Sequence, residues 1–472
     1  MDIHASHNLS LEEMDRQTVL HPFTHLKDHA GGALGTPRII EGGHGVYVRD
    51  RTGREVIDGF SGLYCVNVGY GREEMARAIY EQAQTLAYYH AYVGHSNEPA
   101  IRLSDRLVRM APAGMSKVFY GLSGSDANET QIKIAWYYNN VLGRPQKKKL
   151  IARRRGYHGA TIMSGSLTGL PFYHTAFDIP VRAVLHTTAP HYYWGSHAGE
   201  SEQDFSARCA RELEDLILEE GPDTVAALFA EPVLGTGGII PPPEGYWPAI
   251  QAVLRRHDVL LVADEVVCGF GRVGVPFGSM LYGIEPDLIT VAKGLTSAYV
   301  PLSAAIVGDK VWRVLERGSD TYGAFSHGYT YTAHPLGAAA ALANLDIVER
   351  EDLAGNARDT GGYLLARLRE TFGDHPLVGE VRGIGLLAAL EFVADRGSKT
   401  RFDPALKVGA RVSAAALEEG LIARALPHGD ILGFAPPLVI TRAEVDALVE
   451  RTERAVARVT DALTREGQLA AE

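Results

Sequence analysis

Cysteine is scarce in this sequence, which holds only three in 472 residues. Cys65, Cys209 and Cys268 are an odd number at wide spacings, which suits neither a disulfide framework nor a CxxC metal or redox motif. The chain also lacks an apolar run long enough to span a bilayer. Its first residues show neither the basic start nor the apolar stretch of a secretory signal. These absences predict a cytoplasmic protein without a membrane partner.

An excess of basic residues is missing as well. The 46 lysines and arginines are outnumbered by 57 aspartates and glutamates, which gives a net charge of −11. Because polyanions are bound by basic surfaces, nucleic acid is not an expected partner. The histidines, such as His90, His95 and His334, show no HExxH or paired-ligand spacing, so no metal is expected.

The chain does have a series of apolar runs that alternate with helical stretches, at residues 117–120, 150–152, 224–230, 259–263 and 288–292. This alternation is typical of a mostly parallel α/β sheet. Turn-separated short runs between residues 38 and 58 predict a small antiparallel β unit. Capping boxes at Ser10 and Thr441 predict the starts of two helices, and residues 380–391 suggest a strand pair.

The length exceeds what one ordinary core supports, so more than one domain is expected. We expect an N-terminal segment at residues 1–64, a large α/β domain at residues 65–332 and a smaller C-terminal domain at residues 333–472. The N-terminal segment is expected to join the smaller domain.

Charged residues follow three successive runs of the predicted sheet. Glu231, Asp264 and Lys293 each come directly after an apolar run. Taken alone, Lys293 is better explained as a strand-end lysine whose amine reaches solvent. Ligands of parallel sheets bind outside the carboxyl ends of the strands, however, so three charged ends in a row indicate a site.

These groups suit pyridoxal phosphate, which needs a Schiff-base lysine and a carboxylate on its pyridinium nitrogen. Lys293 and Asp264 supply them. The segment at 121–128 follows a strand and opens a helix, so its amides and the Ser125 hydroxyl can face the phosphate. A plain strand-to-helix loop would look much the same. Tyr157, next to His158, is either a ring that covers the cofactor or an ordinary surface tyrosine.

The ordered motifs resemble the class III aminotransferases, a family of fold-type I pyridoxal phosphate enzymes. The matching stretches lie at residues 261–266, 269–272, 286–287, 292–294, 327–331 and 334–335. The resemblance runs from about Leu20 to about Arg454. Within the family, residues 62–71 and Arg424 resemble the ω-amino acid:pyruvate transaminases, also called amine transaminases.

The resemblance implies an α/β fold with a mostly parallel seven-stranded sheet and a smaller α+β domain built from both ends of the chain. It implies transfer of an amino group from an ω-amino acid or primary amine to pyruvate, which becomes alanine. A decarboxylase, an aminomutase or a non-catalytic cofactor-binding protein stays open as an alternative. A homodimer with shared active sites is also implied, and pairing of dimers into tetramers is left open.

Carried over by resemblance, Lys293 would be the Schiff-base lysine and would move the proton, and Asp264 would pair the pyridinium nitrogen. Val266 would pack against the ring face opposite Tyr157. Further cofactor contacts are implied for Ser123, Gly124, Ser125, His158 and Glu231, and for Thr330, which would reach the phosphate of the neighbouring subunit's cofactor.

The substrate side is implied in the same way. Arg424 would bind the substrate carboxylate through a bidentate pair. The pocket would be lined by Phe23, Leu63, Tyr64, Tyr92 and Tyr157. Among the better-known amine transaminases tryptophan is common at position 64, and position 92 is tyrosine here rather than phenylalanine. We therefore expect a more polar pocket and an altered donor preference, whose direction the sequence does not give.

Overall fold

The computed structural model describes residues 9–469. The first residues, on which the expectation about a secretory signal rests, lie outside that range. Within it, none of the helices combines the length and the apolar character needed to cross a membrane.

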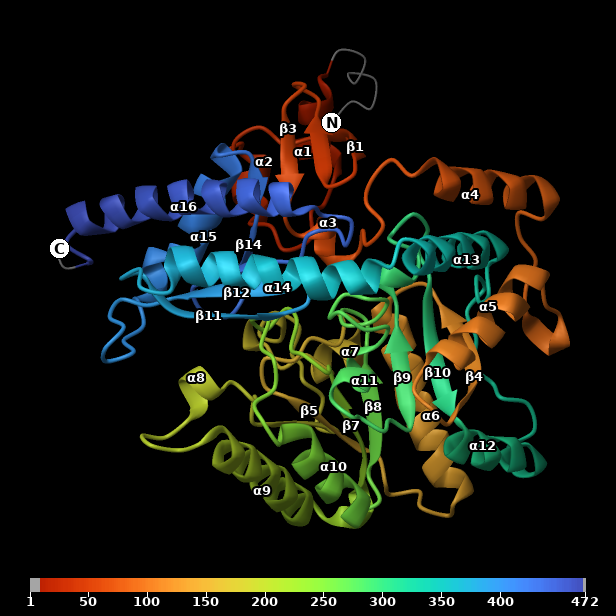
Figure 1. Cartoon of the computed structure of the whole chain (residues 1–472). Coiled ribbons are helices and arrows are strands. Elements are labelled where there is room, and N and C mark those ends of the chain that lie inside the picture. Colours follow the sequence, from red (N-terminus) through yellow and green to blue (C-terminus); the bar gives the residue numbers. More distant parts are fainter. Residues whose placement is uncertain (1–8, 470–472) are drawn as a thin grey trace.

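A seven-stranded sheet lies at the centre of the lower half of the molecule in Figure 1. Its strands, in spatial order, are β4 (Met115–Gly121), β10 (Ser303–Gly308), β9 (Leu288–Val291), β8 (Leu260–Asp264), β7 (Val225–Ala230), β5 (Lys149–Arg153) and β6 (Val184–Thr187). Only β10 runs antiparallel to its neighbours. The mostly parallel seven-stranded sheet is therefore confirmed.

Helices cover both faces of this sheet. Leu150 and Phe229 point to one face and pack with α6 and α12, whereas Ile151 and Leu228 point to the other and pack with α9 and α10. Strands buried on both faces read as continuous apolar runs, which is why they were visible in the sequence. The α-helices between residues 65 and 352 are α4 (Glu73–Thr85), α5 (Glu98–Met110), α6 (Gly124–Val141), α7 (Ile162–Leu167), α8 (Tyr192–Gly195), α9 (Glu202–Glu220), α10 (Tyr246–Arg256), α11 (Gly278–Leu281), α12 (Asp309–Tyr322) and α13 (Pro335–Arg350).

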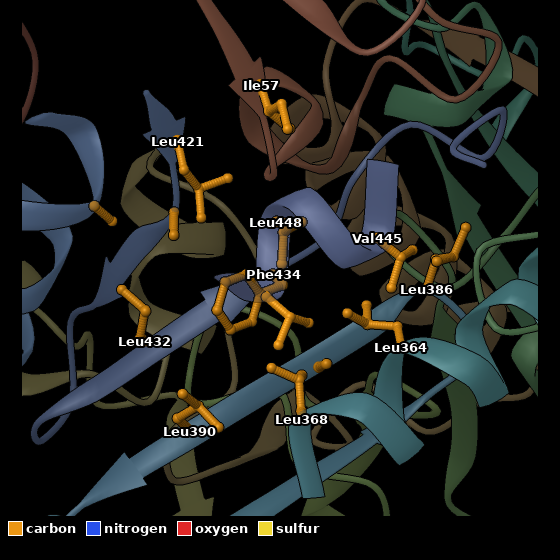
Figure 2. Packing of buried hydrophobic residues seen from close by; sticks show 14 of the residues in the cluster. Ile57, Leu364, Leu368, Leu386, Leu390, Leu421, Leu432, Phe434, Val445 and Leu448 are labelled. Atoms are coloured by element: carbon orange, nitrogen blue, oxygen red, sulfur yellow. The ribbon is translucent and has the colours of Figure 1, made fainter. Parts of the chain in front are cut away.

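The C-terminal part forms a second, four-stranded sheet with the order β11, β12, β15, β14. Figure 2 shows Leu368 of one helix and Leu448 of another converging on Phe434 of this sheet, in a cluster of buried hydrophobic residues. The elements are α14 (Leu353–Phe372), β11 (Val378–Ile384), β12 (Leu387–Phe392), α15 (Val408–Glu418), β14 (Arg424–Leu426), β15 (Ile431–Phe434) and α16 (Arg442–Arg465). The predicted strand pair and the Thr441 capping box are both present.

The N-terminal part packs against the C-terminal part. Strand β13 (Leu421–Ile422) pairs in parallel with β3, so residues far apart in the sequence share a third sheet. Ile57 and Leu421 lie in the same hydrophobic cluster. The N-terminal elements are α1 (Leu11–Thr18), α2 (Leu26–Ala30), β1 (Ile40–His44), β2 (Tyr47–Asp50), β3 (Glu55–Asp58) and α3 (Ser61–Tyr64). The domain boundaries at residues 64 and 332 stay a prediction.

Candidate active site

A cavity of about 290 Å³ lies at the carboxyl ends of β7, β8 and β9. Glu231 directly follows β7, Asp264 ends β8 and Lys293 comes just after β9, and all three line the cavity. The parallel strands therefore bring two carboxylates and an amine to one edge of the sheet, as expected for ligand sites in such sheets.

Asp264 is held in one orientation by hydrogen bonds. Its Oδ2 accepts a hydrogen bond from Nδ2 of Asn128 at 2.9 Å and lies 2.8 Å from Nδ1 of His158. Its Oδ1 accepts the backbone N–H of Val266 at 3.1 Å. The hydroxyl of Thr290 donates to the side-chain oxygen of Asn128 at 2.8 Å, which fixes the amide in turn. These contacts fix the carboxyl group of Asp264 at the base of the cavity.

Sequence analysis did not name Asn128 as a site residue. It lies one turn after Gly124 on α6, so the two share a helix face, and that spacing was the available signal. The structure places His158 behind Asp264, where its imidazole orients the carboxylate. The other ring nitrogen, Nε2, is buried and has no hydrogen-bond partner among residues 9–469. Lining residues that the sequence analysis also missed include Cys65, Thr236, Thr296 and Pro301.

Glu231 ties the end of β7 to the segment that carries Tyr157. Its Oε1 accepts the backbone N–H of Tyr157 at 3.3 Å, and its Oε2 lies 3.4 Å from a guanidinium nitrogen of Arg153. Arg153 also donates to the backbone carbonyl of Glu231. The Tyr157 ring lines the cavity. Burial raises the pKa of its hydroxyl, and the positive charge of Arg424 lowers it by a smaller amount.

The N-terminus of α6 opens into the same cavity. Ser123 is the N-cap, and its hydroxyl accepts the N–H of Asp126 while the Asp126 carboxylate accepts the N–H groups of Leu122 and Ser123. The amides of Gly124 and Ser125 belong to the first turn, where a helix supplies no partner, and both residues line the cavity. These amides form an anion site beside the charged strand ends.

Lys293 stands where the chain leaves β9. Its φ of 45° lies in the left-handed region that non-glycine residues seldom adopt. Its Nζ lies 5.8 Å from the centre of the Tyr64 ring, and no hydrogen bond or ion pair joins it to any residue that the structure describes. An amine without a partner in a cavity is available for covalent chemistry.

The structure does not bring every predicted site residue to this cavity. Phe23, Leu63 and Tyr92 are exposed by 70%, 54% and 44%. Thr330 is also exposed, and its backbone carbonyl accepts the hydroxyl of Tyr88 at 2.6 Å. A single chain thus provides the cofactor end of a site more completely than its substrate end.

Two predicted substrate residues are buried or half-buried near the cavity. Tyr64 is 2% exposed, and its hydroxyl has no hydrogen-bond partner in the described part of the chain. Arg424 on β14 is half-buried, with its guanidinium carbon 5.6 Å from the Phe60 ring. Phe23 reaches the cavity wall indirectly, since its ring lies 5.0 Å from that of Tyr173, which lies 5.5 Å from that of Tyr157.

The groups around the cavity fit pyridoxal phosphate part by part. The helix N-terminus suits the phosphate, the fixed carboxylate of Asp264 suits the ring nitrogen, and the free amine of Lys293 suits the aldehyde. Glycine at position 124 lets the start of α6 lie close to Val266, because an added Cβ would lie only 3.0 Å from that side chain.

Comparison with known proteins identifies the family of this chain. Residues 30–456 match the family described as Aminotransferase class-III. The chain is 64% identical to the diaminobutyrate–2-oxoglutarate transaminase of Halomonas elongata, over 98% of both chains. It is 65% identical to an uncharacterized aminotransferase of Sinorhizobium fredii, over 97% of this chain and 98% of that one.

The fold agrees as well. The solved structure of the ω-transaminase from Pseudomonas jessenii in complex with PMP superimposes with a TM-score of 0.94 at 44% identity, covering 97% of this chain and 99% of that one. An ancestrally reconstructed transaminase superimposes with a TM-score of 0.95 at 70% identity, covering 96% and 99% of the two chains. The chain therefore belongs to the class III aminotransferases, and it is a pyridoxal phosphate-dependent enzyme.

Proposed function

We propose that this aminotransferase moves an amino group from an ω-amino acid or a primary amine to pyruvate, which leaves as alanine. The observation that supports this substrate class is Arg424. It is half-buried, its charge acts on Tyr157 in the cavity wall, and it forms no ion pair with any of residues 9–469. A half-buried guanidinium without a carboxylate is costly, and a keto acid would satisfy it with a bidentate pair.

The residues around the cavity divide the work between them. Pyridoxal phosphate, when bound, supplies a ring that withdraws electrons from the reacting carbon. Lys293 Nζ would take the proton from the substrate Cα and return it to the cofactor carbon that is bonded to the substrate nitrogen. Asp264, oriented by Asn128 and His158, keeps a negative charge beside the ring nitrogen. The same groups serve the donor and the acceptor in turn, so the two substrates alternate at one site.

Arg424 has to serve both halves of that cycle. It holds the carboxylate of the keto acid, and it must leave the pocket tolerant of amines that have no carboxylate. Tyr64 is close to both Arg424 and Lys293. Burial raises the pKa of its hydroxyl, the positive charge of Arg424 lowers it by a smaller amount, and the ring faces the Lys293 amine. We propose that the free Tyr64 hydroxyl makes the donor pocket more polar.

We also propose that two copies of the chain complete each other's sites. The exposed side of the molecule around Thr330 carries Tyr88, Tyr92 and Val93, the last of which is 96% exposed. Such a contiguous set of exposed apolar side chains is typical of a protein interface. A second copy would cover it, and Thr330 would then supply a hydroxyl to the phosphate in the partner's cavity.

A complementation experiment tests the shared site. Lys293→Ala and Thr330→Glu are each expected to inactivate a homodimer. If sites are shared, a mixed dimer has one site with both changes and one with neither. Because about half of the dimers are mixed after dissociation and random re-association, mixing should restore up to about a quarter of the parent's activity. Mixtures without any recovered activity, in a sample that contains mixed dimers, would contradict the shared site.

The substrate proposal is tested by product analysis. The purified holoenzyme is given ω-amino acids, primary amines and diaminobutyrate, each with pyruvate or with 2-oxoglutarate, and alanine, glutamate and carbon dioxide are measured. The diaminobutyrate and 2-oxoglutarate arm is included because of the Halomonas elongata relative. Alanine formation from an ω-amine and pyruvate is the expected result. Glutamate as the only amino product would overturn pyruvate as the acceptor.

A further inference from the structure

Three side chains with metal-binding atoms meet between the first two helices. Asp15 on α1, His21 in the connection and His29 on α2 place their ligand atoms within 4.8 Å of one another. Oδ2 of Asp15 lies 2.9 Å from Nε2 of His21 and 3.4 Å from Nε2 of His29. A tetrahedral zinc site with bonds of about 2.0–2.1 Å holds its ligand atoms roughly 3.3 Å apart. The cluster already has nearly that spacing.

Among the described residues, the partners of these atoms include no lysine or arginine that would compete with an ion, although Nε2 of His21 lies within hydrogen-bond distance of both oxygens of Asp15. Asp15 pairs with no lysine or arginine among residues 9–469, only with the two imidazoles. Nε2 of His29 is buried and, in spite of its nearness to Asp15, makes no hydrogen bond within the described chain. A buried ring nitrogen without a partner is unfavourable, and a bound cation would give it one.

A second cluster of similar composition shows the difference. His191, Glu380 and Glu391 also bring their ligand atoms together. There, however, Arg382 pairs with Glu380 at 2.6 Å and with Glu391 at 2.8 Å, and Arg155 lies 2.5 Å from Nδ1 of His191. Two guanidinium groups already contact the atoms that would bind a metal ion, so this cluster is a structural ion-pair network.

We propose that Asp15, His21 and His29 bind one divalent transition-metal ion of the zinc type, with water completing its coordination. Imidazole nitrogens and a carboxylate are ligands that zinc accepts, and three protein ligands with one open position are common for this ion. The imidazoles bind as neutral rings. The separations of the three residues along the chain match no metal motif, so the sequence pointed to no metal.

The site would act on the wall of the cofactor cavity. Phe23 lies between two of the ligands, His21 and His29, and has a φ of 52°, which is unfavourable for an aromatic residue. Its ring contacts Tyr173, which contacts Tyr157 in the cavity wall. A metal that joins α1 to α2 fixes the segment that carries Phe23, and with it the outer end of this aromatic chain.

Zinc titration of the holoenzyme tests the proposal. The protein is treated with a chelator, freed of it, and titrated with zinc by calorimetry in competition with a chromophoric chelator. The parent is compared with a His21→Gln, His29→Gln double variant. The matched control is His25→Gln in the same segment, since His25 is 67% exposed and its imidazole pairs, within the described chain, only with Asp28, whose backbone N–H it accepts as the N-cap of α2. Retained cofactor absorption in all three proteins shows that they are folded.

The expected result is one zinc ion per chain in the parent and in His25→Gln, with affinity at least tenfold lower in the double variant. Zinc should also raise the Tm of the parent and of the control but not that of the double variant, since a ligand stabilises the state that binds it. A parent without bound zinc, or a double variant that binds as tightly as the parent, would overturn the proposal. Loss of binding in His25→Gln, at a Tm without zinc equal to that of the parent, would overturn this ligand set.

Discussion

The two ends of the cavity are built in opposite ways. At the cofactor end, Asp264, Glu231 and His158 are each 2% exposed and are fixed by hydrogen bonds within one chain. At the substrate end, Phe23 and Tyr92 lie largely in the open. The difference teaches that a single chain fixes the cofactor end in advance, whereas Phe23 and Tyr92, which we propose meet the substrate, remain on a surface.

Removing the Lys293 amine at the cofactor end should have the largest effect on activity. Lys293→Ala deletes the group that we propose moves the substrate proton, so we expect transaminase turnover to fall by about 10²–10⁴-fold or more. The measurement is the rate of amino-group transfer, with circular dichroism as the check on folding. Lys310→Ala is the control, because Lys310 lies on α12 and pairs with Asp287 away from the cavity. Equal activity of Lys293→Ala and Lys310→Ala would contradict the proposed role of Lys293.

Neutralising the fixed carboxylate should come next. Asp264→Asn keeps the shape and one acceptor oxygen but removes the charge beside the ring nitrogen. We expect kcat to fall by about 10²–10³-fold, the size typical of losing one preorganised electrostatic group. Kinetics of both half-reactions would show the fall in each, because one carboxylate serves both. A loss confined to one half-reaction would contradict this role.

The burial of the cofactor end can be tested through Glu265, the fully buried neighbour of Asp264. Burial raises its pKa to about 7, although the N–H groups of Gly278 and Ser279 and the Ser279 hydroxyl donate to its carboxyl oxygens. Between pH 4.5 and pH 7 the folded chain therefore keeps a proton that the unfolded chain has lost. The stabilisation is fully present below pH 4.5 and is lost as the pH rises through 7.

We accordingly expect the free energy of unfolding of the parent to fall, relative to that of Glu265→Gln, by roughly 3 kcal/mol over this range. Denaturant unfolding at a series of pH values from 5 to 8 measures it. The variant has a lower stability overall, because an amide replaces one acceptor oxygen, so the slope with pH is the quantity to compare. Parallel curves would show that Glu265 is ionised in both states.

At the open end the expected effect is smaller and selective. Arg424→Ala removes a charge-assisted pair with the keto-acid carboxylate, which is worth about 1.5–3 kcal/mol, so KM for pyruvate should rise by roughly 10–100-fold. The KM of a primary amine without a carboxylate should hardly change. Steady-state kinetics with both substrate types give the ratio. An equal rise for both would place Arg424 in a structural role.

The fold could be predicted from the sequence where strands are buried on both faces and therefore form continuous apolar runs. The runs that became β5, β7, β8 and β9 were visible for that reason. Strand β6 lies at the edge of the sheet, and its short segment Val184–Thr187 includes a polar histidine. Strand β10 begins Ser-Ala-Ala, and small residues give little strand signal. These two strands were therefore not anticipated from the residues themselves.

The candidate site divides in the same way. Strand ends can be counted along a chain, so Glu231, Asp264 and Lys293 could be placed at one edge from the sequence. The contact between Asp264 and the His158 imidazole joins residues that are 106 positions apart, and no local pattern reports such a pair. The metal-ligand cluster at the first two helices was hidden for the same reason, because its geometry depends on how α1 and α2 pack.

The antiparallel direction of β10 has a consequence for how this enzyme can change. Since β10 returns directly beside β9, with Ala304 opposite Val291, the connection at residues 292–302 is tied at both ends to paired strands. We therefore expect that one residue gained or lost there displaces the Lys293 amine relative to Asp264 on the adjacent β8. We expect the exposed turn at residues 397–400 to accept insertions without moving this amine.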